Sequence, residues 1–573
     1  MPVSRRPSEK GTAVASPSSA PSQPDRIEDR LAQLEKLVRG LEGSLNSATA
    51  PNQPVGSQND VSLVTSPSTE EKRTYNQTIP LERGFDRDAS RSRPKINDRS
   101  ITSFNGQLFV PTSFPLAPRQ MATHEEGSPK KGQTVSQNHS DSNCFLPDPD
   151  EGSSLLNEYL NDFNSKIPLF HPKTIYCHVR DCYTGAANQV PLSWVLTYIV
   201  FGIAYRLRAM SLFVAPNDTS NGDWYLQKCL SALPDLLLQQ PSLGLIQALL
   251  GVSVLLQSSK RSQRSALFVS TAMHMAQDLA YNEGDPDSGE SLSRDTQELY
   301  VFWMAFFMST ASDLRTIRPI TQRLADISVP LPSPSAPDWW ASKFLVDDPL
   351  DWKVNVLALH ASLAVVQAKI LEELFSVSAR RHSTDLITDK FQTMVSNLET
   401  WRRSKFPANL DAQNILDDMY RSDVAHAVIL EASYFGTLYQ LHAGHALGAF
   451  TQRQDVFSSD ILRAVAGLIS IDIYPDAQRL LMMAASILQG NMPVIWIAIH
   501  ALIPALCMVL DCYEHWNGTS STILQPRSIA ASMQVYNNIL EILESVTAQA
   551  DDTDLALSIA VCRHLYAQVK GGD

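Results

Sequence analysis

The chain contains 573 residues, of which 44% are hydrophobic, and its formal net charge at pH 7 is −13. This length exceeds one typical core, so the chain forms either two domains or one large body with unfolded attachments. Residues 1–151 contain 16 of the 34 prolines and hold 18 basic against 19 acidic residues, whereas the remainder holds 29 basic against 41 acidic residues. Because an acidic surface repels a phosphate backbone, this balance excludes direct DNA binding by the larger part.

The cysteines and the apolar runs indicate an intracellular chain without a membrane anchor. Seven scattered cysteines, an odd number, are typical of reduced thiols rather than of a disulfide framework. The first residues lack the apolar core of a secretory signal. Met492–Leu510 is almost long enough to span a bilayer, but Pro493, His500 and Pro504 interrupt it. We expect a buried core helix there rather than a membrane span.

The first 46 residues consist of two segments with different sequence patterns. Residues 1–24 form a basic tail rich in Ser and Pro and are expected to be disordered. In residues 25–46 the apolar side chains recur at alternating spacings of four and three, the heptad seam of a short coiled coil: Ile27, Leu31, Leu34, Val38, Leu41 and Leu45. We expect this helix to pair two chains, as a homodimer or a heterodimer. The alternative, a helix docked on the larger body, is disfavoured by the long proline-rich segment that follows.

The rest of the chain divides into a linker and a helical body. Residues 47–152 are expected to be mostly disordered, with one ordered segment near 101–114 where apolar and polar residues alternate. Residues 153–573 show helical periodicity and almost no strand-like alternation. The sequence thus predicts an all-α fold, in which a large multi-helix domain follows a disordered linker and a short N-terminal coiled coil. A first helix is expected to stop at Pro168–Pro172, and later blocks are expected at 194–210, 224–238, 243–257, 264–281, 351–380, 384–403, 421–448, 457–490, 492–515, 525–548 and 553–569.

A strongly apolar helix followed by a proline-rich strap lies at the centre of this helical body, within Glu298–Pro332. Proline cannot continue a helix, so Pro319 ends this one near Arg318, and Val329–Pro332 is expected to run extended over the surface. Asp313 and Arg318 flank the corner, where we expect them to pair with backbone groups or with each other. The helix needs partners on most sides because large apolar residues recur along it: Leu299, Phe302, Trp303, Phe306, Phe307 and Leu314.

This segment resembles the middle regulatory domain of fungal zinc-cluster transcription factors. The family members usually have Gly-Arg-Pro where this chain has Ile317-Arg318-Pro319, and a glycine where Ala280 stands. The resemblance covers about residues 153–345 and implies that residues 153–573 form the all-helical regulatory domain. The residues that carry it are interpreted as a structural motif rather than as a site: Phe302, Trp303, Asp313, Arg318, Pro319, Asp326, Pro330 and Pro332.

The resemblance also implies a DNA-reading module that this sequence does not contain. The family reads DNA through an N-terminal module in which six thiolates hold two zinc ions, but no cysteine precedes Cys144. Either the sequence begins downstream of the true start, or this member lacks the cluster and acts through a partner. Zinc is therefore expected only with an upstream six-cysteine module, and no cofactor is expected in this chain.

No catalytic constellation accompanies these features. The sequence contains no phosphate-binding glycine loop, nucleophile elbow or metalloprotease helix, and the spacing of His442 and His445 is interpreted as helix packing rather than as a metal site. No catalytic or metal-binding residue is therefore predicted. The resemblance implies a dimeric nuclear regulator of RNA polymerase II transcription that controls a metabolic gene cluster, such as one for secondary metabolism, and answers to a small-molecule or protein effector. DNA contact would use the missing zinc cluster or a partner's. The alternatives are an all-helical enzyme and an adaptor that does not bind DNA.

Overall fold

The computed structural model describes residues 146–210, 217–284, 296–333, 355–405, 421–450, 455–488, 492–516, 526–548 and 552–571, which all belong to one compact unit. Fourteen α-helices, several short 3₁₀- and π-helical turns and no strand occur among these residues. The all-α expectation is therefore confirmed for the part of the body that is described. The predicted coiled coil at 25–46 and the segment at 101–114 lie outside the described residues.

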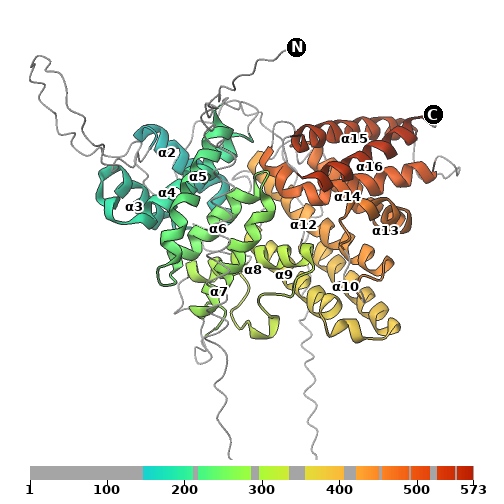
Figure 1. Ribbon diagram of the computed structural model, residues 1–573, viewed down its shortest axis with the longest axis horizontal. Coiled ribbons are helices and arrows are strands. Elements are labelled where there is room, and N and C mark those ends of the chain that lie inside the picture. The colour runs from blue at the N-terminus through green and yellow to red at the C-terminus, as the bar shows by residue number, and fades with distance from the viewer. Residues whose placement is uncertain are drawn as a thin grey trace, which may run out of the picture. The chain divides into compact units, whose positions relative to one another are not determined.

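The first helices pack around α4, which is buried on almost every side because its sequence is apolar on every face. α4 contacts α2, α3, α5 and α6, and α6 in turn contacts α7. Figure 1 shows these helices beside one another. Their bounds are α2 (Pro149–Glu158), α3 (Pro172–Thr184), α4 (Pro191–Arg208), α5 (Asp218–Leu237), α6 (Leu243–Gln257) and α7 (Ser265–Asp278), with short turns η1 (Tyr159–Asn164), η2 (Ala186–Gln189) and η3 (Ser262–Arg264).

Helix α3 is missing from the blocks that the sequence predicts, because Pro172 is interpreted there only as the stop of the preceding helix. In the structure Pro172 is the first residue of α3, a position where the missing N–H needs no partner. The His171 ring nitrogen Nδ1 accepts a hydrogen bond from the Lys173 N–H (3.2 Å) and caps the helix. Gly185, with φ 78°, ends it in the left-handed conformation that glycine tolerates.

Helix α8 (Thr296–Thr316) has packing partners on most sides, as its apolar pattern predicts. It contacts α6, α7, α9 (Val356–Ile370) and α12 (Arg421–Ala446). The chain then leaves through the strap, which includes the short turn η4 (Leu324–Asp326). Within Val329–Pro332 the first and last residues are buried and the two between are exposed, so this extended segment lies against the body surface.

The remaining helices surround α14 (Met492–Trp516), which contacts α12, α13, α15, α16 and also α6. Among the described residues α14 is the one helix long and apolar enough to cross a membrane, but 89% of its apolar window is buried inside the protein. It is placed as the buried core helix that the sequence predicts. The other bounds are α10 (Thr384–Lys405), α13 (Ser459–Ala485), α15 (Pro526–Thr547) and α16 (Thr553–Gly571), with turns η5 (Leu371–Phe375) and η6 (Ala379–Arg381) after α9.

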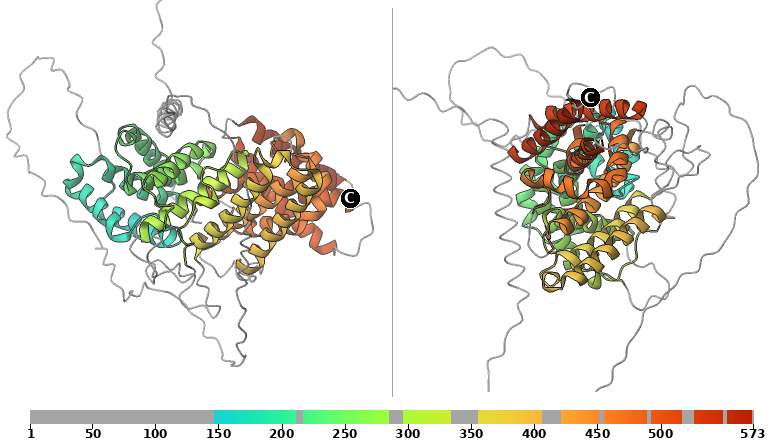
Figure 2. Two further views of the ribbon diagram at one scale, coloured as in Figure 1. Left: turned by 90° about the horizontal axis from the view of Figure 1, so that it is seen from below. Right: turned by 90° about the vertical axis from the view of Figure 1, so that its right-hand side faces the viewer.

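Two groups of helices thus meet along α8 and α14. In the left view of Figure 2, α2–α7 lie on one side, α8–α10 toward the middle and α12–α16 on the other side. Contacts of α6 with α8 and α14, and of α8 with α12, join the two groups. The cavities described below lie at this junction.

Candidate functional site

An inner cavity of about 180 Å³ lies where α8, α9, α12 and α14 meet. The α8 residues that line it are Phe307, Met308, Ala311, Ser312, Leu314 and Arg315. Positions one, three or four residues apart recur in this set, so the residues share one broad face of the helix. This face is therefore mostly apolar and has a cation, Arg315, at its C-terminal end.

Helix α12 leaves the inner cavity open because most of its lining residues are small. A Cβ atom built at Gly436 would meet only the Cβ of Ala501, at 3.9 Å, so no side chain fills the space there. The amide of Gln367 on α9 donates to the Thr437 hydroxyl (2.8 Å), and the amide of Gln440 donates to the carbonyl of Leu314, so the polar lining is largely paired. The α12 residues that line the cavity are Ile429, Ala432, Ser433, Gly436, Thr437 and Gln440.

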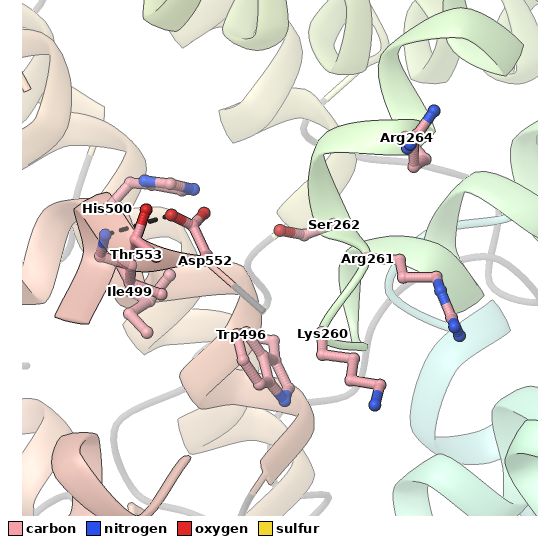
Figure 3. A pocket seen from close by; sticks show the side chains of 10 residues that line it. Lys260, Arg261, Ser262, Arg264, Trp496, Ile499, His500, Asp552 and Thr553 are labelled. Carbon is pink, nitrogen blue, oxygen red and sulfur yellow. Dashed lines mark hydrogen bonds between the residues drawn. The ribbon is translucent and has the colours of Figure 1, made fainter. Parts of the chain in front are cut away.

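His500 on α14 borders the inner cavity and two further cavities. The second cavity, of about 410 Å³, lies between the end of α8, α14 and the start of α16, and it also includes Arg315. The third cavity, of about 390 Å³, is bounded by the Lys260–Arg264 segment, α14 and the start of α16. Figure 3 shows His500 and Asp552 on one wall of the third cavity, facing the Lys260–Arg264 segment across it. The three cavities therefore adjoin at His500.

Arg315 borders the inner and second cavities without an ionic partner. Within the described part of the chain its guanidinium makes no hydrogen bond or ion pair. Burial lowers the pKa of Arg315, and repulsion from Arg318 lowers it further. The C-terminal end of α8 offsets part of the charge. Arg315 is half-buried, and removing a cation from water is costly unless it is paired. The cavity wall therefore offers an unpaired positive charge to an anion.

His500 and Ser312 add two uncharged polar groups beside Arg315. Burial, and then the charge of Arg315, lowers the pKa of His500 to about 3. The imidazole is neutral at pH 7, so one of its ring nitrogens is a hydrogen-bond donor. The Ser312 hydroxyl is buried and, like the His500 ring, makes no hydrogen bond within the described ranges. Both groups are available to a bound molecule.

The carboxylates at the rim of the second cavity already have backbone partners. Asp455 accepts from the Phe457 N–H (3.0 Å), and Asp552 accepts from the Leu555 N–H (3.1 Å) at the start of α16. Asp554 accepts from the hydroxyl (2.6 Å) and the N–H (3.3 Å) of Ser459. These contacts cap helices and turns, and none of these carboxylates forms an ion pair with Arg315.

The histidine pair that the sequence analysis considered, His442 and His445, is not in the lining of these cavities. No group of three or more His, Cys, Asp or Glu residues that could hold a metal gathers within the described ranges. His445 stacks on the Phe391 ring at 4.1 Å between ring centroids, and His442 meets the same ring edge-on at 5.3 Å. The two histidines thus pack against an aromatic ring, as their sequence interpretation proposed.

The family-motif residues are distributed between the core and the strap, and the structure brings some of them together. The Trp303 indole N–H donates to the carbonyl of Pro330 (2.8 Å), so the strap is fastened to α8. Two rings of the helix, Phe302 and Phe306, stack on each other. Phe302, Trp303, Asp313 and Pro332 are buried, whereas Arg318, Pro319, Asp326 and Pro330 are exposed.

Asp313 fixes the corner at the end of α8. Its carboxylate oxygen Oδ2 accepts hydrogen bonds from the Thr321 hydroxyl (3.0 Å) and the Thr321 N–H (3.2 Å). The Arg318 N–H donates to the carbonyl of Asp313 (2.8 Å), while the Arg318 side chain is exposed. The pairing with backbone groups is confirmed, and no side-chain ion pair joins Asp313 to Arg318. These contacts are structural.

Sequence reasoning missed Arg315 and Ser312 and noted His500 only as an interruption of an apolar run. The signal that could have found them is an isolated polar residue on the buried face of an otherwise apolar helix. The predicted dimerisation residues lie outside the described residues: Ile27, Leu31, Leu34, Val38, Leu41 and Leu45.

Comparison with known proteins finds similarity to fungal transcription factors. Residues 156–403 match the family described as "Fungal specific transcription factor domain". An "ABC-transporter-regulating transcription factor" of Aspergillus fumigatus is 24% identical over 436 residues, which are 73% of this chain and 46% of the relative. A protein of the same name from Aspergillus oryzae is 27% identical over 297 residues, 52% of this chain and 33% of the relative. The chain thus spans less than half the length of either relative. No solved structure matches it significantly.

Proposed function

We propose that the protein is a nuclear regulator of RNA polymerase II transcription, because residues 156–403 match the fungal specific transcription factor domain. The family is one of transcription factors and not of enzymes. The observation that carries the proposal is this match, which covers α8, its strap and the helices around them.

The acidic body acts at a distance from DNA in this proposal. Residues beyond 151 carry 41 acidic against 29 basic side chains, so the phosphate backbone is contacted by another module. That module is a zinc cluster that precedes this sequence or belongs to a partner, and the heptads at 25–46 hold two chains together so that two modules read spaced half-sites.

The proposed targets are genes of a metabolic cluster, including one for secondary metabolism. The names of the two Aspergillus relatives favour a second set of targets, genes for ABC transporters. Both sets of target genes fit a regulator that binds a small molecule and controls the expression of proteins that make, degrade or export that molecule. The cavities at the junction of α8 and α14 supply a place where such a molecule binds.

Deletion of the gene tests this function. We expect the transcripts of one gene cluster or of transporter genes to change several-fold in a genome-wide expression comparison. Chromatin immunoprecipitation of the tagged chain should find it at the promoters of those genes. Unchanged transcription together with absence from chromatin would instead support an adaptor that acts elsewhere.

A further inference from the structure

We propose that the adjoining cavities bind one small organic monoanion, whose charged group contacts Arg315 and His500 and whose body occupies the inner cavity. The binding rests on the cavities alone, while its role as an effector rests on the proposed function.

The lining of the inner cavity holds the cation Arg315 and no carboxylate among the described residues, which favours a monoanion, and a carboxylate in particular. Among the described residues, Arg315 is the one unpaired cation that borders both the inner and the second cavity. Its planar guanidinium matches a carboxylate through two parallel hydrogen bonds. The neutral His500 adds a donor without adding charge. A phosphomonoester carries about −1.5 to −2 charges at pH 7, which one guanidinium does not balance.

The inner cavity sets the size and character of the body of this ligand. At about 30 Å³ per molecule its volume of about 180 Å³ equals that of roughly six waters, so it accepts a group of about that many heavy atoms. Phe307, Met308 and Trp496 give it apolar surface. The unpaired Ser312 hydroxyl offers a hydrogen bond to a polar atom near the charged end.

The approach to the site and its rigidity fit the same ligand. The third cavity is bordered by Lys260, Arg261 and Arg264, and their positive charge favours the entry of an anion. The end of α8 is held in an unusual backbone conformation, because Ile317 has φ 49°. Strained residues of this kind persist where the surroundings fix them, often beside binding sites.

A bound anion would connect the two groups of helices. Arg315 belongs to α8, which contacts α6 and α7 of the first group, and His500 belongs to α14 of the second group. A ligand that contacts both side chains stabilises the arrangement in which they are close, by mass action on that state.

Calorimetric titration of the full chain with octanoate, octyl phosphate and 1-octanol tests the proposal. Octanoate should bind, 1-octanol should bind at least tenfold more weakly, and octyl phosphate should bind more weakly than octanoate. Failure of both anions to bind, or equal binding of 1-octanol, would overturn the site. Tighter binding of octyl phosphate would overturn its assignment to a monoanion.

Three variants locate the ligand. Arg315→Gln should lower the affinity for octanoate at least tenfold. Arg463→Gln removes the same charge from a half-exposed residue on α13 and should leave this affinity unchanged. Gly436→Leu keeps every charge and fills the inner cavity, so it should also lower the affinity for octanoate at least tenfold. Thermal melts show whether each variant is folded. Wild-type affinity in both cavity variants would refute the placement, and a silent gene deletion beside intact binding would refute only the regulatory function.

Discussion

Two single residues differ from the family pattern that the sequence resembles, and both have unusual backbone angles. Ala280 and Ile317 have φ angles of 55° and 49°, and no other non-glycine residue described has a positive φ. The left-handed conformation costs a residue with a Cβ about 1–2 kcal/mol. These are the two positions where the family resemblance points to glycine, so the glycine has a physical reason at each.

Ala280→Gly should stabilise the protein by about 1 kcal/mol, because glycine adopts φ 55° without the steric cost. The backbone hydrogen bonds of this turn, such as Tyr281 N–H to the Ala276 carbonyl (2.8 Å), remain available. Urea unfolding of the full chain measures the change. Ala276→Gly, inside α7, is the control and should destabilise, so a loss of stability in both variants would contradict the prediction.

Trp303 binds the strap through one hydrogen bond, and its ring packs in the core. Two substitutions separate these roles. Trp303→Phe keeps much of the apolar ring but removes the hydrogen bond to the carbonyl of the exposed Pro330, at a cost of about 0.5–1.5 kcal/mol. Trp303→Ala should cost about 3–5 kcal/mol, as for other buried aromatic residues, and unfold the body at moderate temperature. Circular dichroism melts distinguish the two. A fully folded Trp303→Ala variant that lost regulation would show that this helix is a functional surface.

Asp313 makes the stability of the corner depend on pH. Burial raises its pKa from 3.8 to about 6, so folding favours the protonated form. The protonated Asp313 carboxyl therefore contributes fully to the free energy of unfolding below pH 3.8, and this contribution is lost as the pH rises through 6. Asp313→Asn keeps an oxygen that accepts from Thr321, so it should be more stable than the wild type at pH 7.5, by up to about 3 kcal/mol. This difference should shrink toward pH 4.5 in urea unfolding. The same substitution at the exposed Asp326 is the control, and a difference that does not vary with pH would refute the assignment.

At the scale of helices, small residues decide where two helices touch and where a cavity remains. In α6 a Cβ atom at Gly251 would lie 2.5 Å from the Ile199 Cγ2 of α4, so this glycine allows the close packing of the two helices. In α12 a Cβ atom at Gly436 would find ordinary contact and space beyond it. Glycine therefore allows close helix packing in α6 and leaves a cavity beside α12.

Gly436→Ala and Gly251→Ala should therefore change stability in opposite directions. Alanine inside a helix is favoured over glycine by roughly 0.5–1 kcal/mol, and Gly436→Ala should gain this amount. Gly251→Ala should lose about 1–3 kcal/mol because the core would be overpacked against Ile199. Thermal melts of the two variants provide the measurement. A Gly436→Ala variant that melts lower than the wild type would indicate that the cavity is tighter than the structure shows.

At the scale of the whole molecule, charge and association are assigned to different parts of the chain. The helical body carries the negative charge, whereas residues 1–151 are nearly neutral and contain the predicted coiled coil. In the proposed regulator, the helical body that binds the ligand is therefore separate from the segment that is predicted to pair two chains. The arrangement leads to a prediction for the intact protein.

Removal of residues 25–46 should convert a dimer into a monomer, because the heptad seam supplies the contact between chains. Sedimentation equilibrium of the full and shortened chains measures the mass. The helical body should keep its melting temperature, since these residues are predicted to form a separate helix. Equal masses for the two chains would disprove the dimerisation role.

The sequence predicted more of the fold than of the candidate site. The periodicity of α8 and α14 was sufficient to place both in the core, and Pro319 marked the end of α8. Helix α3 was missed because a proline can both stop one helix and start the next, and only the cap formed by His171 distinguishes the two. Arg315 and His500 are 185 positions apart in the chain, and no spacing rule relates residues so distant.

By itself, the sequence determined the all-helical class, the acidic body, the strap and the family resemblance, because periodicity, charge and local motifs are properties of short segments. Tertiary structure alone decided that the end of α8 meets the middle of α14 beside small residues of α12, which leaves a cavity with an unpaired guanidinium. The physical reason is that an unpaired charge and an empty volume are defined by what surrounds them. They exist only after distant helices have packed.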